Sequence, residues 1–274
     1  MTLPNWWSRL FKELGLLAGA FGRIAATANL SISLENAIQQ ARARAGHFLQ
    51  DESLGRIYRE ITLPDLEICS PVAAQLHPPG TAIGGTRLRI IYACYDDVDQ
   101  KSSFGYDEID RIRRADFQVV VEGIVQFGSA LIDLQEHWRV DTHYFQGESR
   151  EPHPLFHFQR GGHAQDIFAA LPGFLPGECL ADATFPPETK LRSLMQTQTP
   201  RLALPPMDPV CAIDFVVGQH DGRIRSALWG MPEYAGAVRR AQERLWEPYF
   251  ELLRDKEHRR KLMPFFGPAR PTAP

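Results

Sequence analysis

Two short stretches concentrate polar side chains that could do chemistry. Residues 153–163 read HPLFHFQRGGH, and residues 137–145 read HWRVDTHYF. Histidine titrates near neutral pH, a neighbouring carboxylate orients its ring, and arginine suits a phosphate or carboxylate ligand. This combination is typical of acid–base or phosphoryl-transfer chemistry if the fold brings the residues onto one surface.

Strand periodicity predicts such a surface. Side chains alternate across a strand, so a hairpin folded about residue 149 pairs Asp141 with His157 and Arg139 with Gln159. A slip of one residue would move aromatic side chains of the reverse face out of the core. We expect that reverse face to be buried through Trp138, Tyr144, Phe156 and Phe158. The candidate catalytic residues form the opposite, polar patch: His157, Asp141, Gln159, Arg139 and His143.

Three interpretations of this patch stay open. The residues can be solvated cross-strand pairs on the outer side of a one-sided sheet. They can form the site of a small hydrolase or phosphotransferase, with the Asp141–His157 pair doing acid–base work. Two histidines and an aspartate can also hold a metal ion. We assign no metal and no cofactor.

The segment HPLFHFQRGG resembles the H-x-H-x-Q stretch of the histidine-nucleophile nucleotidyltransferases. His157 and Gln159 match its second histidine and its glutamine, whereas Leu155 stands at the place of the first histidine. The resemblance implies that His157 attacks a phosphate and that Gln159 holds it.

Two other landmarks resemble ubiquitin-conjugating (E2-like) folds, which also have a helix followed by a β-meander. They are the His-Pro pair at 153–154 and the sequence GECL at 177–180. The two landmarks lie much further apart here than in that family, and no asparagine follows the His-Pro pair. The resemblance implies that Cys179 carries a thioester.

Composition narrows the class of protein. The 274 residues are 44% hydrophobic and 23% charged, with a net charge of −3, as in soluble globular proteins that do not bind nucleic acid through an overall positive field. The four cysteines form no C-x-x-C pair, which favours a reducing cytoplasm over a disulfide framework. No apolar run is long enough to span a membrane. The Arg, Ala and Pro content suggests a bacterial source.

Changes of hydrophobic period predict one α+β domain over residues 1–267. We expect an N-terminal helical layer over 6–60, then an antiparallel β-meander of about four strands over 86–160. A Pro-rich connection over 164–206 leads to C-terminal helices over 209–262, in which Asp208 caps the first helix and Pro248 interrupts a longer one. Residues 268–274 are predicted to be disordered.

Because no catalytic motif is complete, we expect a non-enzymatic, cytoplasmic interaction subunit of a bacterial multiprotein system. The hydrolase or phosphotransferase is the alternative, and the E2-like protein is a second one. Trp6 and Trp7 would dock a protein partner through the N-terminal helix. Nucleic-acid binding is the less favoured alternative, through Arg111, Arg113 and Arg114.

Overall fold

A computed structural model describes eight segments of the chain: residues 3–28, 34–68, 82–97, 106–127, 130–142, 154–160, 202–219 and 222–262. The Pro-rich connection over 164–201 and the tail 268–274 lie outside these residues. So do His143, Tyr144 and Cys179.

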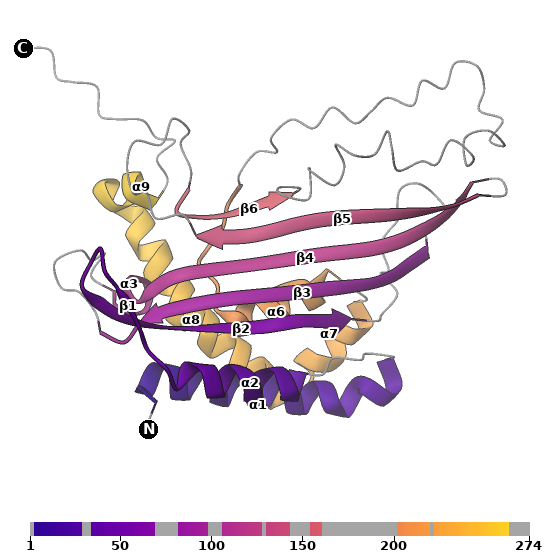
Figure 1. The fold of residues 1–274 in the computed structure, drawn as a ribbon, viewed down its shortest axis with the longest axis horizontal. Coiled ribbons are helices and arrows are strands. Elements are labelled where there is room, and N and C mark those ends of the chain that lie inside the picture. Colours follow the sequence, from indigo (N-terminus) through magenta and orange to yellow (C-terminus); the bar gives the residue numbers. More distant parts are fainter. Residues whose placement is uncertain are drawn as a thin grey trace, which may run out of the picture.

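The centre of the fold is an antiparallel sheet of seven strands, which lie side by side in chain order (Figure 1). Each strand therefore pairs with its neighbours in sequence, as in a meander. The strands are β1 (Leu49–Asp51), β2 (Arg56–Ile68), β3 (Ala82–Tyr95), β4 (Ile112–Phe127), β5 (Ala130–Thr142), β6 (Phe156–Arg160) and β7 (Leu202–Ala203).

Helices pack on one face of the sheet. Trp7 of α1 (Asn5–Ala28) meets Tyr92 of β3 edge-on, and Phe215 of α6 (Pro209–Gly218) meets Trp138 of β5. The other helices are α2 (Leu34–Ala45), α3 (Asp107–Asp110), α7 (Gly222–Trp229), α8 (Pro232–Arg254) and α9 (Lys256–Leu262). The chain is thus an α+β protein whose sheet is covered on one side by helices from both ends of the sequence (Figure 1).

The core lies between this helical layer and the sheet. One alternating set of side chains runs across the strands in register: Ile61 opposite Tyr92, and Phe117 opposite both Ile90 and Val140. All of these are at most 3% exposed. The other set faces away from the helices and carries most of the charged strand residues, as the period of two predicts.

The sheet is larger than the four strands expected over 86–160, and the helical layer is correspondingly shorter. Residues 49–51 and 56–68 are strands rather than part of an N-terminal helical layer that reaches residue 60. Pro64 lies within β2, where the register between β2 and β3 shifts between Leu63 and Leu66, and an irregularity of this kind accommodates a proline within a strand.

The C-terminal helices also differ from the prediction at one proline. Helix α8 continues through Pro248 to Arg254. The break comes at Asp255, whose backbone is extended and whose Oδ1 accepts hydrogen bonds from the backbone N–H groups of Glu257 and His258. Capping of the next helix by this carboxylate therefore sets the boundary. The predicted cap Asp208 is confirmed, because its Oδ1 accepts from the backbone N–H of Cys211 at 2.9 Å.

Within the described residues, no helix combines the length and apolar character that a membrane span requires.

Candidate functional site

The predicted hairpin register is present between β5 and β6. Asp141 lies opposite His157, and Arg139 lies opposite Gln159. Trp138 and Phe158 pack together on the reverse side, with ring centroids 5.7 Å apart. Of the five candidate residues, four are therefore brought together, and we call them the sheet-face network: Arg139, Asp141, His157 and Gln159.

Asp141 is the centre of this network. Its Oδ1 lies 2.6 Å from Nε2 of His157, and its Oδ2 lies 2.9 Å from Nε of Arg139. Arg139 also donates from Nη2 to Oε1 of Gln159 at 2.9 Å. One carboxylate thus contacts two cationic or potentially cationic groups, and the arginine links it to the glutamine.

Of the three interpretations, solvated cross-strand pairs do not describe the centre of this patch. His157 is fully buried, Gln159 is 4% exposed and Asp141 is 6% exposed. His157 does not point toward the helices, since its neighbours Phe156 and Phe158 pack on that side. It lies on the opposite face of the sheet and is nevertheless out of solvent. Alternation assigned the face correctly, but a strand pattern carries no information about what else covers that face.

Both ring nitrogens of His157 lie against oxygen atoms. Nδ1 is 3.2 Å from the carbonyl oxygen of Pro154, and Nε2 faces the Asp141 carboxylate. A ring held between two oxygen acceptors is fixed in its orientation. A general base or a nucleophile needs a nitrogen lone pair within reach of its substrate. The contacts therefore suit a buried structural ion pair better than an open catalytic dyad.

The network continues as a polar row across the sheet. Arg89, Gln118, Arg139 and Gln159 lie opposite one another on four successive strands, β3 to β6. Exposure falls along this row, from the exposed Arg89 to the buried Gln159. The polar face of the sheet is thus partly accessible over β3 and β4, and its charged groups become buried toward β6.

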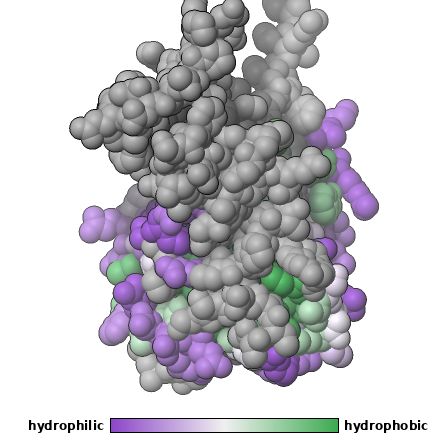
Figure 2. Space-filling model, turned by 90° about the vertical axis from the view of Figure 1, so that its right-hand side faces the viewer, coloured by the Kyte–Doolittle hydropathy of each residue, from purple (hydrophilic) through white to green (hydrophobic). Residues whose placement is uncertain are grey.

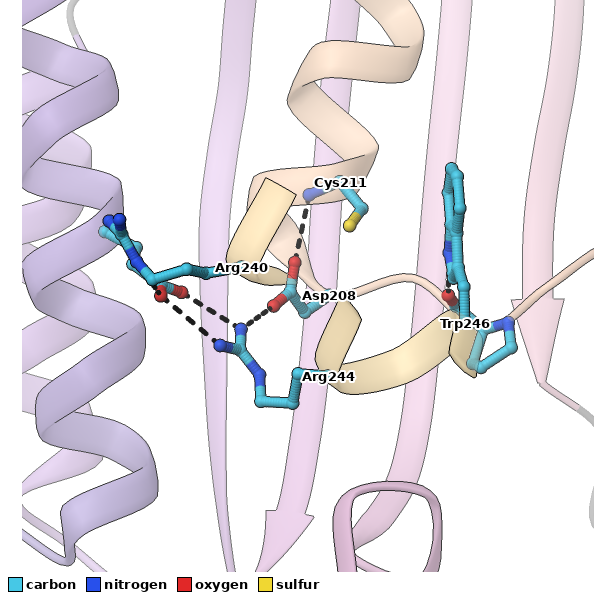
Figure 3. A network of polar contacts seen from close by, with 7 residues as sticks. Asp208, Cys211, Arg240, Arg244 and Trp246 are labelled. Carbon is cyan, nitrogen blue, oxygen red and sulfur yellow. Dashed lines mark hydrogen bonds and ion pairs between the residues drawn. The ribbon is translucent and has the colours of Figure 1, made fainter. Parts of the chain in front are cut away.

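A second buried network joins the helices, and no motif or spacing in the sequence predicts it. Arg244 of α8 contacts Oε2 of Glu13 at 3.0 Å and Oδ2 of Asp208 at 2.6 Å (Figure 3). We call these three residues the helix-layer cluster. Glu13 and Asp208 are at most 2% exposed, so the arginine neutralises two carboxylates in the interior. Burial lowers the pKa of Arg244, but the charges of Asp208 and Glu13 outweigh it and raise that pKa overall.

The described cysteines are poor candidates for nucleophiles. Burial raises the pKa of the Cys94 thiol to about 12, and it raises that of Cys211 well above its usual range. Since the thiolate is the reactive form, both side chains behave as small apolar groups in the core. Cys179 lies outside the described residues, so its thioester role stays a prediction.

Trp6 and Trp7 do not form the predicted docking surface. Trp6 is 6% exposed and Trp7 is fully buried. The Trp6 ring lies 5.1 Å from the guanidinium of Arg244, and Trp7 stacks near Phe11 and meets Tyr92. These indoles join α1 to the sheet and to α8, so the large apolar residues near the N-terminus are used inside the chain.

The arginines considered for nucleic acid are engaged within the chain as well. A basic cluster in the sequence does not become a basic surface when each guanidinium meets an acidic side chain or a carbonyl group. The contacts are Arg111 Nη1 to the carbonyl oxygen of Asp96 at 2.7 Å, Arg113 Nε to Asp51 Oδ2 at 3.0 Å, and Arg114 Nε to Asp116 Oδ2 at 2.6 Å.

The described part of the chain offers little space for a small ligand and no cluster of metal-binding side chains. A half-open cavity of about 220 Å³ lies where the start of α1 meets Asp96 and Glu108, and no residue of the sheet-face network lines it. The described residues contain no group of three or more side chains placed to hold a metal ion.

Exposed apolar side chains gather at one place, which sequence reasoning missed. Among the described residues, four of the six large exposed apolar ones lie within ten positions, in and around the β1–β2 turn: Phe48 at 55%, Leu49 at 46%, Leu54 at 57% and Ile57 at 44%. We call residues 48–57 the 48–57 hairpin. It lies at the end of the molecule where β1 is labelled in Figure 1. Among the described residues visible in Figure 2, which shows the other end, hydrophilic ones prevail and apolar ones form small separate patches.

The base of this hairpin is held by a polar network around Asp51. Its carboxylate accepts from the Ser53 hydroxyl at 2.6 Å, the Tyr95 hydroxyl at 3.0 Å and Nε of Arg113 at 3.0 Å. The Ser53 and Arg113 hydrogen bonds hold the pKa of Asp51 well below its usual range, although burial acts in the opposite direction. Gly55 closes the turn at φ +64°, where glycine is favoured, and donates its N–H to the carbonyl of Asp51 at 2.8 Å.

Comparisons with known proteins found no matching family model, no matching curated protein and no matching solved structure. The argument for function therefore rests on the residues described above.

Proposed function

We propose that this chain is a non-enzymatic interaction subunit, a cytoplasmic component of a bacterial multiprotein system, and that the 48–57 hairpin is its contact surface. The observation that carries the proposal is the gathering of Phe48, Leu49, Leu54 and Ile57 on one turn, each about half exposed. They lie on both faces of the hairpin, because Leu49 pairs with Tyr58 and Ile57 pairs with Gln50. Exposed apolar residues scattered singly are ordinary, whereas several on one short hairpin are typical of an interaction site.

The energetics support a contact at this surface. Full burial of a large aliphatic or aromatic side chain contributes about 1.5 to 3 kcal/mol, so a half-exposed one still has roughly 1 kcal/mol to gain. Four of them on one hairpin offer several kcal/mol to a partner that covers them. Because the Asp51 network holds the base of the hairpin, little conformational entropy is lost on binding.

The buried state of the sheet-face network supports the same proposal indirectly. A substrate would have to reach His157, which is fully buried and lies between a carboxylate and a carbonyl oxygen. The 48–57 hairpin is accessible without any rearrangement. A contact function at the hairpin therefore requires no change in the structure, whereas catalysis would require His157 to become accessible to a substrate.

Co-expression with the products of neighbouring genes, followed by native mass spectrometry, tests the proposal. We expect a complex with at least one product, and we expect Leu54→Asp with Ile57→Asp to abolish it. The matched control is Phe250→Asp, because Phe250 is similarly exposed, at 51%, and lies on α8. If none of the products binds, or if the hairpin variant binds as well as the control, the proposal is wrong.

The alternative function is a small hydrolase or phosphotransferase, favoured by the 2.6 Å contact between Asp141 and His157. On that hypothesis His157→Ala and Asp141→Ala abolish an activity and leave the melting temperature nearly unchanged. If both variants instead lower the melting temperature by several degrees, the network is structural.

A further inference from the structure

The outer edge of β1 is open for pairing. β1 is the first strand of the sheet and pairs only with β2 among the described strands. Leu49 and Gln50 are exposed, and neither has a backbone hydrogen bond to another described residue outside the β1–β2 ladder. An edge strand with free N–H and C=O groups is a template for another strand, and proteins usually protect such an edge. Here apolar residues flank it instead.

We infer that two copies of this chain join through the outer edges of their β1 strands, so that the two sheets continue into one. This inference rests on the proposed role of the 48–57 hairpin as a contact surface. It assigns the β1 edge, with Phe48 and Leu49, to a second copy and leaves Leu54 and Ile57 to the partner protein. A two-fold symmetric contact must be self-complementary, because each residue meets the same surface on the other copy. Three features of the hairpin meet that condition: its direction, its apolar residues and its charges.

A two-fold axis between the two β1 strands makes them antiparallel. When this pairing is centred on Gln50, Leu49 lies opposite the second copy's Asp51. In that register the two copies of Leu49 are diagonal neighbours on one face, close enough for side-chain contact. Phe48 comes opposite the second copy's Glu52. The pairing thus covers Phe48 and Leu49, which are 55% and 46% exposed in the single chain.

The charges on either side of β1 have opposite signs. Before the strand, the last turn of α2 carries the exposed Arg42 and Arg44, followed by the exposed His47. After it comes the exposed Glu52. Within the described residues neither arginine nor Glu52 has an ion-pair partner. Antiparallel pairing brings the segment before one strand beside the segment after the other, so each copy's basic turn meets the other copy's Glu52.

Glu52 also distinguishes this occupant from an anionic membrane. A hairpin that inserts into such a membrane has an apolar or basic tip, whereas residues 52–55 here read ESLG. A carboxylate at the turn would face lipid phosphates of the same sign. In the symmetric pair it meets arginine.

Sedimentation velocity of the full chain over micromolar to hundred-micromolar concentrations tests the inference. We expect wild type to approach twice its 31.0 kDa mass. Leu49→Glu should weaken association about tenfold or more, because it places two carboxylates on the shared face. Phe250→Glu, on α8, is the control and should leave the dimer unchanged.

A charge exchange tests the register. Glu52→Arg should weaken the dimer by about fivefold, as expected for a surface ion pair replaced by like charges. Arg44→Glu should do the same. The double variant should recover most of the loss, because it restores opposite charges across the contact. Thermal melts of each variant ensure that a folded chain is compared.

Several results would overturn the inference. One is a wild-type monomer at every concentration, and another is a dimer that Leu49→Glu does not affect. A monomer that binds phosphatidylserine-containing vesicles through the hairpin would assign the surface to a membrane. A monomer whose hairpin variant loses a neighbouring-gene product would overturn the dimer and leave the proposed function standing.

Discussion

The sheet-face network and the helix-layer cluster are both buried charge networks, but they are assembled from different distances along the chain. Arg139, Asp141, His157 and Gln159 lie within 21 positions of one another on two paired strands. Glu13, Asp208 and Arg244 come from α1, the N-cap of α6, and α8. The first network follows from alternation and one register. The second exists only after three distant segments have packed together.

The two networks also differ in how deeply the partners of the central charge are buried. In the helix-layer cluster, Arg244 stands between two carboxylates that are almost completely buried. In the sheet-face network, Asp141 stands between His157 and Arg139, and Arg139 keeps 16% of its side chain exposed. Removing the one cation between two buried carboxylates costs more than removing His157 from a carboxylate that keeps the partly exposed Arg139. The comparison therefore predicts a ranking of variants.

The largest effect is expected for Arg244→Met, which keeps the side-chain volume and removes the charge. Asp208 loses its cation and Glu13 keeps only the partly exposed Arg240, so the free energy of unfolding should fall by about 3 to 5 kcal/mol. Urea unfolding measures this. Arg240→Met is the control, since that side chain is 51% exposed and lies 3.4 Å from Glu13, and it should cost at most about 1 kcal/mol. Equal effects of the two variants would contradict the central role of Arg244.

His157→Ala should have the next largest effect, about 2 to 3 kcal/mol, because it leaves a cavity and takes one partner from the buried Asp141 carboxylate. Calorimetric melting measures the loss. Gln118→Ala, half-buried on the same sheet face, should cost less than about 1 kcal/mol. A His157 variant as stable as wild type would reopen the catalytic interpretation of the network.

Asp51→Asn should cost about 1 to 2 kcal/mol at neutral pH, because it weakens the hydrogen bonds from Ser53, Tyr95 and Arg113. The pKa of Asp51 is lowered in the folded chain, so its carboxylate stabilises the fold above the unfolded pKa near pH 4. That stability is lost as pH falls below about 4 toward the folded pKa. Unfolding curves of wild type and variant should therefore converge in acid. A gap that is independent of pH would contradict the assignment.

The smallest effect on stability is expected for Leu54→Asp. Leu54 is 57% exposed at the hairpin turn, so the change should alter the free energy of unfolding by no more than about 0.5 kcal/mol. The melting temperature should stay within about 2 °C of wild type. A larger loss would mean that the hairpin supports the fold rather than a contact.

Part of the fold could be predicted from local pattern. The β-meander, the antiparallel β5–β6 register and the Asp208 cap all depend on neighbours in sequence. The strands β1 and β2 differ from the helical layer expected up to residue 60, because their pairing depends on β3, which lies further along the chain. Pro248 is typical of a helix break, yet α8 continues through it to Arg254.

Which side chains share a strand face follows from the amino-acid sequence, because the period of two is a local property of the extended chain. Which of those faces are buried depends on the packing of segments that are distant in the chain. His157 and Trp7 are fully buried, whereas Leu49 and Leu54 remain exposed. For His157 and the two leucines, residue hydrophobicity alone predicts the opposite. Burial depends on what packs against a residue from elsewhere in the chain, and pairing partners such as Glu13 and Arg244 meet only when distant helices close over the sheet.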